Sequence, residues 1–173
     1  MKRLFFALPI PVPLKKQILQ SFPQKTFVGI RFTSEENLHL TTHFLGAVPE
    51  DKLGEIILLA EKIAATASSF DLKLESYQTV IRNRKPVMIW AQFEESAGFE
   101  GLCLKLRKAF PTEENRTPNP HATLARIKQL KQLPFNLPIA KPSSFIASQI
   151  ELWESKTEST GATYSKIVGW KLG

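Results

Sequence analysis

A five-residue pattern, Asn-x-His-x-Thr, occurs twice in this chain, each time within an apolar stretch. The first copy lies in NLHLTTHFLG, residues 37–46, and the second in NPHATLAR, residues 119–126. The chain has three histidines, and two of them, His39 and His121, belong to this pattern nearly half the chain apart. Short apolar segments bounded by polar turns, glycine or proline are typical of strands. The repeat therefore predicts two similar lobes that face one another, each with one such strand.

The remaining segments mix strands and helices. Phe70, Leu72 and Leu74 alternate with charged residues, which predicts a strand with one buried face. The expected strands are Arg3–Pro9, Leu38–Leu45, Phe70–Val80, Val87–Phe93, His121–Ile127, Phe145–Glu154 and Tyr164–Leu172, and the expected helices begin at Pro13 and Pro49 and span Ser96–Phe110. Alternating strands favour antiparallel sheets with helices packed outside them. We expect an α+β fold in which residues 1–173 form a single bilobal domain.

Composition limits the class of protein and the compartment. Apolar residues make up 43% of the chain, enough for a hydrophobic core, and the net charge of +7 is compatible with polyanionic partners such as nucleic acid. The apolar part of the amino-terminal segment is only Leu4 to Ile10, so we expect a first strand there and neither a signal peptide nor a membrane span. The one cysteine, Cys103, lies among leucines and can form no internal disulfide, which favours a packed thiol and a cytoplasmic location. We also expect a monomer.

Strand geometry places histidine and threonine of each copy side by side. Residues two apart in a strand point to the same face, so His39 and Thr41 share one face, and His121 and Thr123 share another. By the same alternation Phe44 lies on the opposite, apolar face. One neutral and one protonated imidazole suit phosphodiester cleavage, since one accepts a proton and the other donates one. Threonine hydroxyls stabilise the phosphate oxygens that gain charge. These residues leave open which histidine plays which part.

A metal site is the competing interpretation of the first copy. His39 and His43 form His-x-x-x-His, a zinc-binding spacing when it occurs on a helix. However, Leu-Thr-Thr between them favours a strand, and the glutamate of a His-Glu-x-x-His motif is absent. We therefore expect neither a metal nor another cofactor. Strict alternation gives His43 the same face as His39, so it either lines the edge of the cleft or is a solvated neighbour.

At these residues the chain resembles the 2H phosphoesterase family, specifically the RNA 2′,3′-cyclic phosphodiesterases, also called 2′-5′ RNA ligases. HLTTHFLG is similar to the family motif H-x-T-x-x-F-L-G, and HATLAR is similar to H-x-T-L-A-R. The segments RLFFALPIP, IRFTSEENLHLT, MIWAQF and IELWESK also lie where the family has similar ones. One departure is Thr42, which stands where the family commonly has leucine and which faces the core by alternation.

The resemblance implies a two-lobed fold with a central groove and hydrolysis of an RNA 2′,3′-cyclic phosphate end to a 2′-phosphate. It implies that His39 is the proton donor and His121 the proton acceptor, with Thr41 and Thr123 holding the phosphate. Arg126 completes the second motif, either as a further phosphate contact or as a partner in a structural salt bridge. Strict alternation puts Arg126 opposite His121, so the phosphate contact requires a bulge or a strand end.

Other residues are candidates for gripping the nucleotide. Arg31 is a candidate cation, and Trp153 and Tyr164 could each either stack on a base or pack in the core. Arg82, with its basic neighbours in the turn RNRKP, could meet an RNA tail or form a solvated hairpin tip. The sequence has no phosphate-binding loop for ATP, so 2′-5′ ligation could only be a reversal of cleavage. Three alternatives stay open: a 2′,5′-linked oligonucleotide as substrate, a small cyclic nucleotide as substrate, and an RNA-binding module without activity.

Overall fold

The computed structural model describes residues 1–23, 25–113, 117–158 and 161–173. Strands and helices follow one another through the chain, with a short 3₁₀ helix at Glu35–Asn37 and another at Glu50–Lys52. The strands are β1 (Lys2–Pro9), β2 (Ile30–Phe32), β3 (His39–Val48), β4 (Phe70–Arg82), β5 (Lys85–Phe93), β6 (His121–Ile127), β7 (Ser143–Ala147), β8 (Gln149–Glu158) and β9 (Gly161–Lys171). The α-helices are α1 (Val12–Gln20), α2 (Leu53–Ala65) and α3 (Ala97–Ala109). The α+β prediction is confirmed.

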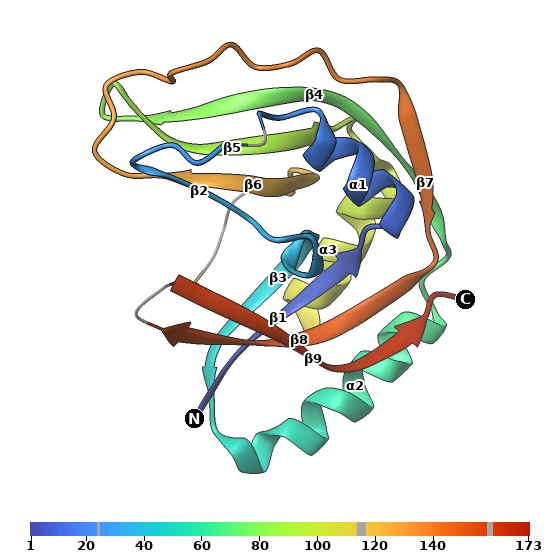
Figure 1. Cartoon of the computed structure of the whole chain (residues 1–173). Coiled ribbons are helices and arrows are strands. Elements are labelled where there is room, and N and C mark those ends of the chain that lie inside the picture. Colours follow the sequence, from blue (N-terminus) through green and yellow to red (C-terminus); the bar gives the residue numbers. More distant parts are fainter. Residues whose placement is uncertain (24, 114–116, 159–160) are drawn as a thin grey trace.

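The strands form one nine-stranded antiparallel sheet in the order β7-β4-β5-β6-β3-β1-β8-β9, with β2 added beside β6. The two predicted lobes are the two halves of this sheet, which curls so that its ends approach one another (Figure 1). The predicted single strand Phe145–Glu154 is wrong: β7 pairs with β4 and β8 pairs with β1, with only Ser148 between β7 and β8. This one-residue link forces the two halves of the sheet together. The three-residue strand β2 was not predicted.

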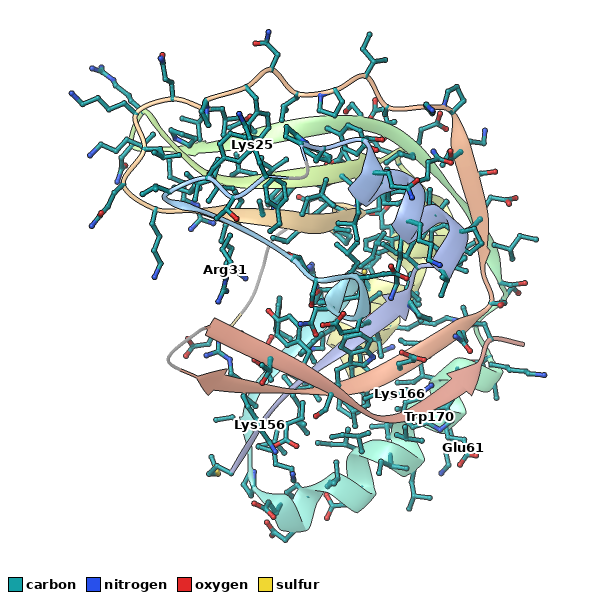
Figure 2. All side chains as sticks on the ribbon, viewed as in Figure 1. Lys25, Arg31, Glu61, Lys156, Lys166 and Trp170 are labelled. Carbon is teal, nitrogen blue, oxygen red and sulfur yellow. The ribbon has the colours of Figure 1, made fainter. Side chains whose placement is uncertain are left out.

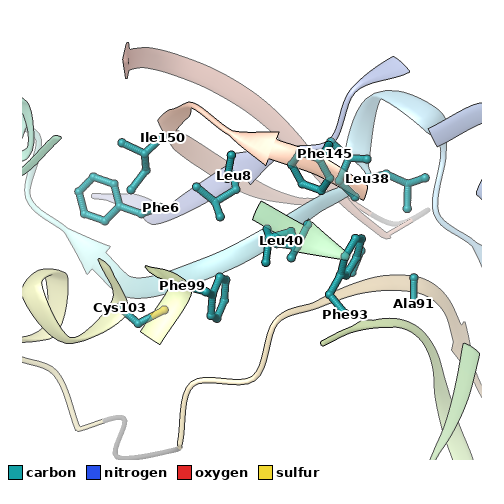
Figure 3. Close-up of a cluster of buried hydrophobic side chains, with 14 of the residues drawn as sticks. Phe6, Leu8, Leu38, Leu40, Ala91, Phe93, Phe99, Cys103, Phe145 and Ile150 are labelled. Atoms are coloured by element: carbon teal, nitrogen blue, oxygen red, sulfur yellow. The ribbon is translucent and has the colours of Figure 1, made fainter. Parts of the chain in front are cut away.

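A hydrophobic core fills the inside of the curl. Phe6 and Leu8 of β1, Leu40 of β3 and Phe93 of β5 are fully buried, and they meet Phe99 and Cys103 of α3 (Figure 3). The predicted packing role of Cys103 is confirmed, since its side chain is buried in this cluster. Ser96 caps α3 by accepting a hydrogen bond from the Phe99 amide. A Cβ added at Gly98 would overlap the Phe70 ring, so glycine permits the close approach of α3 to β4.

Candidate active site

The two motif strands, β3 and β6, are neighbours in the sheet. They pair at a single position, Leu40 with Ala122, and both of these side chains are buried. The antiparallel register around this pair sets His39 beside Thr123 and Thr41 beside His121. Both histidines and both threonines line the same cleft. On one face of an antiparallel pair, diagonal neighbours such as the two histidines have backbones roughly 7–8 Å apart. At this spacing both rings can contact the same small bound group.

Each catalytic candidate is held by the backbone two residues before it. His39 Nδ1 lies 2.7 Å from the carbonyl oxygen of Asn37, and His121 Nδ1 lies 2.8 Å from that of Asn119. Because a carbonyl can only accept, both Nδ1 atoms carry a hydrogen and donate it. Nε2 is therefore the nitrogen of each ring that can gain or lose a proton. In His39 this atom lies 3.1 Å from the Thr41 hydroxyl, which donates to it when the ring is neutral.

A β-bulge follows the threonine of each motif. In β3 the register with β1 skips Thr42, and in β6 the register with β5 skips Leu124. Each extra residue reverses the alternation beyond it, so Arg126 returns to the cleft face of its strand. The sequence required a bulge or a strand end for Arg126 to reach the phosphate, and this bulge meets that requirement. The equivalent residue of the first motif, Phe44, also turns to the cleft and is 44% exposed, which corrects its predicted position on the apolar face.

The bulge also decides the environment of His43. Its side chain is only 2% exposed, and its Nε2 lies 2.7 Å from the carbonyl oxygen of Phe110, just beyond α3. His43 is therefore not a solvated neighbour, but it is among the residues that line the cleft, which was the other predicted alternative. It is not placed for the zinc spacing with His39, whose Nε2 faces Thr41. No three histidine, cysteine, aspartate or glutamate side chains gather as a metal site in the described part of the chain.

Aromatic rings surround His39 on the side away from β6. Its imidazole centroid lies 5.0 Å from Phe5, 5.0 Å from Trp153 and 5.3 Å from Tyr164. Burial lowers the pKa of His39 to about 4, although the hydrogen bond to Asn37 acts in the opposite direction. In the free protein this ring is therefore neutral at pH 7.

Positive charges contribute further to the low pKa of His39. Lys15, His121 and Arg126 all lower it through space. His121 and Arg126 belong to the second motif, so the two motifs lie close enough for their charges to interact, in agreement with the cleft that both line.

His121 has a different environment. Its imidazole stacks on the indole of Trp90, with ring centroids 3.8 Å apart and planes inclined by 28°. Gln92 supports His121 indirectly. Its buried amide donates at 2.6 Å to the side-chain oxygen of Asn119, and the backbone carbonyl of Asn119 accepts the hydrogen bond from His121. Neither Trp90 nor Gln92 was predicted as a site residue. The feature that could have indicated them is their position in β5, the strand beside the second motif strand.

The cleft has a volume of about 610 Å³. Of the predicted substrate contacts, Arg31 and Tyr164 line it, and Arg82 lines it as well. Trp153 is 6% exposed and packs behind His39, so it has no free face on which a base could stack. Across the described ranges, the helices are too short or too polar for a membrane crossing.

Comparisons with known proteins agree with this geometry. Residues 8–90 match the family model "LigT like Phosphoesterase". The chain is 30% identical to the RNA 2′,3′-cyclic phosphodiesterase of Methanocaldococcus jannaschii over 97% of this chain and 99% of that protein. Its fold is similar to the crystal structure of TT0787 from Thermus thermophilus, with a TM-score of 0.84 at 23% identity and coverage of 98% and 97%. It is also similar to E. coli LigT complexed with 3′-AMP, with a TM-score of 0.79, 26% identity and coverage of 99% and 98%.

The resemblance seen in the two motifs is thus supported over the whole chain. The alignment with the M. jannaschii relative covers both proteins almost from end to end, and the structural neighbours have the same fold. The chain belongs to the LigT-like phosphoesterases, the 2H phosphoesterase family, and is a hydrolase.

Proposed function

We propose that this protein opens 2′,3′-cyclic phosphates at RNA ends and leaves a 2′-phosphate. The observation that carries this proposal is the pair of imidazoles in one cleft, each fixed through Nδ1 by a backbone carbonyl so that Nε2 is available for proton transfer. The name of the M. jannaschii relative and the 3′-AMP complex of E. coli LigT support an RNA or nucleotide substrate.

The proposed reaction is an in-line attack by water on phosphorus. Nε2 of His121 takes a proton from the water, the new P–O bond forms, and the bond from phosphorus to O3′ breaks. His39 Nε2–H gives its proton to the departing O3′, so one proton enters and one leaves the pair. The hydroxyls of Thr41 and Thr123 donate to the non-bridging oxygens, and the guanidinium of Arg126 adds positive charge. A 5′-hydroxyl in place of water would give the 2′-5′ linkage of the ligation reaction.

The division of roles between the histidines follows from the resemblance, and the low pKa of His39 adds a condition to it. A ring that is neutral in the free protein must gain its proton when the substrate binds. The negative charge of the phosphodiester supplies the reason, because an anion close to the imidazole favours its protonated form. Substrate binding and protonation of His39 are therefore coupled in this proposal.

The experiment is steady-state hydrolysis of 2′,3′-cyclic mononucleotides in the presence of EDTA, with analysis of which hydroxyl keeps the phosphate. Removing one member of an acid–base pair costs roughly 10²- to 10⁴-fold in rate, so His39→Ala and His121→Ala each lose turnover by that factor while thermal unfolding shows a folded protein. The double variant is no slower than either single variant, because the two residues act as a unit.

Three results would contradict the proposal. Turnover that survives either single substitution excludes the pair as the acid–base machinery. Loss of wild-type turnover in EDTA brings back a metal-dependent reaction. Cyclic nucleotides that bind without being hydrolysed favour a binding module.

A further inference from the structure

The charge of the cleft exceeds what one reacting phosphate needs. Four arginines, Arg31, Arg82, Arg107 and Arg126, line it, and no aspartate or glutamate is among its lining residues in the described part of the chain. A 2′,3′-cyclic phosphate carries a single negative charge. The reacting group is already provided with two threonine hydroxyls, an imidazole pair and Arg126 in the proposed function. Positive charge is therefore left over along the rest of the cleft.

Two of these arginines stand side by side on neighbouring strands. In the register of β2 with β6, Arg31 lies directly opposite Arg126, and Met88 of β5 lies on the other side of Arg126. Neighbouring strands are about 5 Å apart, and like charges directly opposite one another destabilise a sheet. An anion bound between the two guanidinium groups removes that repulsion. Figure 2 shows Arg31 extending from β2 into the space between β6 and the β8–β9 hairpin.

Arg82 continues this row beyond Met88. It is the last residue of β4, next to the turn in which Asn83 and Arg84 have left-handed backbone conformations. Val80, two residues earlier, pairs with Met88. Arg31 and Arg82 thus flank the Arg126–Met88 segment, and all four side chains line the cleft. Met88 and Phe32 add apolar surface among the guanidinium groups. A positively charged groove with interspersed apolar and aromatic surface is the usual arrangement for single-stranded nucleic acid.

We propose that Arg31 and Arg82 bind the phosphates of the RNA chain on the 5′ side of the reacting end, so that the protein grips a single-stranded tail as well as the terminal nucleotide. This inference rests on the proposed function, which supplies the reacting end. Arg31 and Arg82 lie on the two sides of Arg126, which contacts the reacting phosphate in the proposed function, and together they form the track of the tail.

The test compares 2′,3′-cyclic CMP with a tetranucleotide that ends in the same cyclic phosphate. The wild-type protein prefers the tetranucleotide in kcat/KM. In Arg31→Ala and in Arg82→Ala the ratio of the two kcat/KM values falls about tenfold, as expected when one charge-assisted hydrogen bond to a phosphate is removed. The dependence of log kcat/KM on log salt for the tetranucleotide becomes shallower by about 0.7 for each phosphate that is no longer neutralised. Arg31→Lys keeps part of the preference because it keeps the charge.

Arg3→Ala is the matched control, since Arg3 is an exposed arginine of β1 outside the cleft and its removal changes the net charge equally. A ratio that stays at the wild-type value in both Arg31→Ala and Arg82→Ala overturns the track. A ratio that falls equally in Arg3→Ala also overturns it, since the effect is then general attraction. Weaker inhibition by ATP in Arg31→Ala, with tetranucleotide turnover unchanged, assigns the arginines to a nucleotide polyphosphate instead.

Failure of the proposed function has a different signature. If the wild-type protein hydrolyses neither substrate, the reaction is wrong, whereas the track is still measurable as binding. A fluorescent tetranucleotide ending in a 2′-phosphate then binds the wild-type and Arg3→Ala proteins alike and binds Arg31→Ala and Arg82→Ala about tenfold more weakly. Equal binding to all four proteins overturns the track.

Discussion

Trp153 donates a hydrogen bond from its indole Nε1 to Glu151 Oε2 at 2.8 Å, and both side chains are buried. The other carboxylate oxygen accepts from Lys166 Nζ at 2.6 Å. The indole in turn lies 5.0 Å from the ring of His39 and 5.9 Å from that of Phe5. Glu151 therefore fixes the aromatic wall behind His39 without touching the cleft itself.

Substitution of Glu151 is expected to impair catalysis through Trp153. Glu151→Leu leaves a buried indole N–H without its acceptor, which costs about 1–3 kcal/mol of unfolding free energy. The loosened wall lets His39 move, and a displacement of about 1 Å in a catalytic group can cost roughly 100-fold in rate. We expect kcat to fall by a factor of about 10 to 100 with little change in KM, and Glu151→Gln to recover much of it because its amide oxygen still accepts.

Glu154→Leu is the control for this experiment. Glu154 lies on the same strand and also pairs with a lysine, Lys2, at 2.8 Å, whereas the indole N–H of Trp153 is bonded to Glu151. It is expected to change stability and not kcat. Equal loss of kcat in the Glu154 and Glu151 variants would show that the effect is a general loosening of β8.

Gln92 has the corresponding position behind His121. Its amide donates to Asn119 Oδ1 at 2.6 Å and to the carbonyl oxygen of Phe93 at 2.9 Å. Gln92→Leu frees the segment whose carbonyl orients His121, so kcat is expected to fall about tenfold or more. Gln78→Leu, on the adjacent strand β4 and bonded only to Ser76 among the described contacts, is expected to keep the wild-type kcat. Normal turnover in Gln92→Leu would mean that Trp90 alone orients the ring.

The departure of Thr42 from the family pattern has a measurable cost. Its side chain is 4% exposed, and in the described structure its Oγ1 has no hydrogen-bond partner. Thr42→Val keeps the shape and removes the buried hydroxyl, so we expect about 1 kcal/mol more unfolding free energy with turnover intact. Thr41→Val is the same chemical change one residue earlier, and it is expected to reduce turnover without raising stability. A Thr42→Val protein less stable than wild type would show that the Thr42 hydroxyl makes a stabilising hydrogen bond.

The sequence was informative wherever strict alternation holds and uninformative wherever it breaks. Alternation placed His39 with Thr41 and His121 with Thr123 because the first three residues of each motif strand are regular. It misplaced Phe44, and it left Arg126 conditional, because Thr42 and Leu124 are bulge residues. A bulge depends on register with a neighbouring strand, and a strand pattern carries no information about its partner.

The two buried residues that orient the site, Gln92 and Glu151, could not be predicted from the sequence either. Gln92 acts through Asn119, 27 residues away, and Glu151 acts through Trp153 on its own strand, but polar residues in apolar strands have no distinctive local pattern in either case. The antiparallel α+β class was predictable, since it follows from strand alternation and helix spacing alone. The division of residues 143–158 into β7 and β8 was not, because it depends on how the whole sheet curls.

Protonation of His39 on substrate binding is testable in an inactive variant. In His121→Ala, His39 is the remaining imidazole of the motif pair, and a cyclic mononucleotide is a monoanion that does not titrate near neutrality. A contacting anion raises an imidazole pKa by about 1–3 units, from the value of about 4 that burial gives His39. Calorimetry in buffers of different ionisation enthalpy is expected to show uptake of up to one proton per cyclic mononucleotide bound between about pH 5 and pH 7.

The double variant His39→Ala, His121→Ala is the control and is expected to take up none. Absence of uptake in His121→Ala would make His39 a neutral ring in the complex, and the roles of the two histidines would have to be exchanged.

The low pKa of His39 also makes stability depend on pH. In the unfolded chain its pKa is about 6.5, and in the folded protein burial lowers it to about 4. Above about pH 6.5 the ring is neutral in both states and costs nothing. As the pH falls from about 6.5 towards 4, the unfolded chain binds a proton that the folded protein excludes, so unfolding becomes easier, by about 2–3 kcal/mol at pH 4.5. Glutamine at position 39 cannot titrate. We therefore expect the unfolding free energy, measured in urea, to decrease between pH 7 and pH 4.5 by about 2–3 kcal/mol less in His39→Gln than in the wild type. The carboxylates and the other two histidines are common to both proteins, so a parallel fall would show that His39 is readily protonated in the folded state.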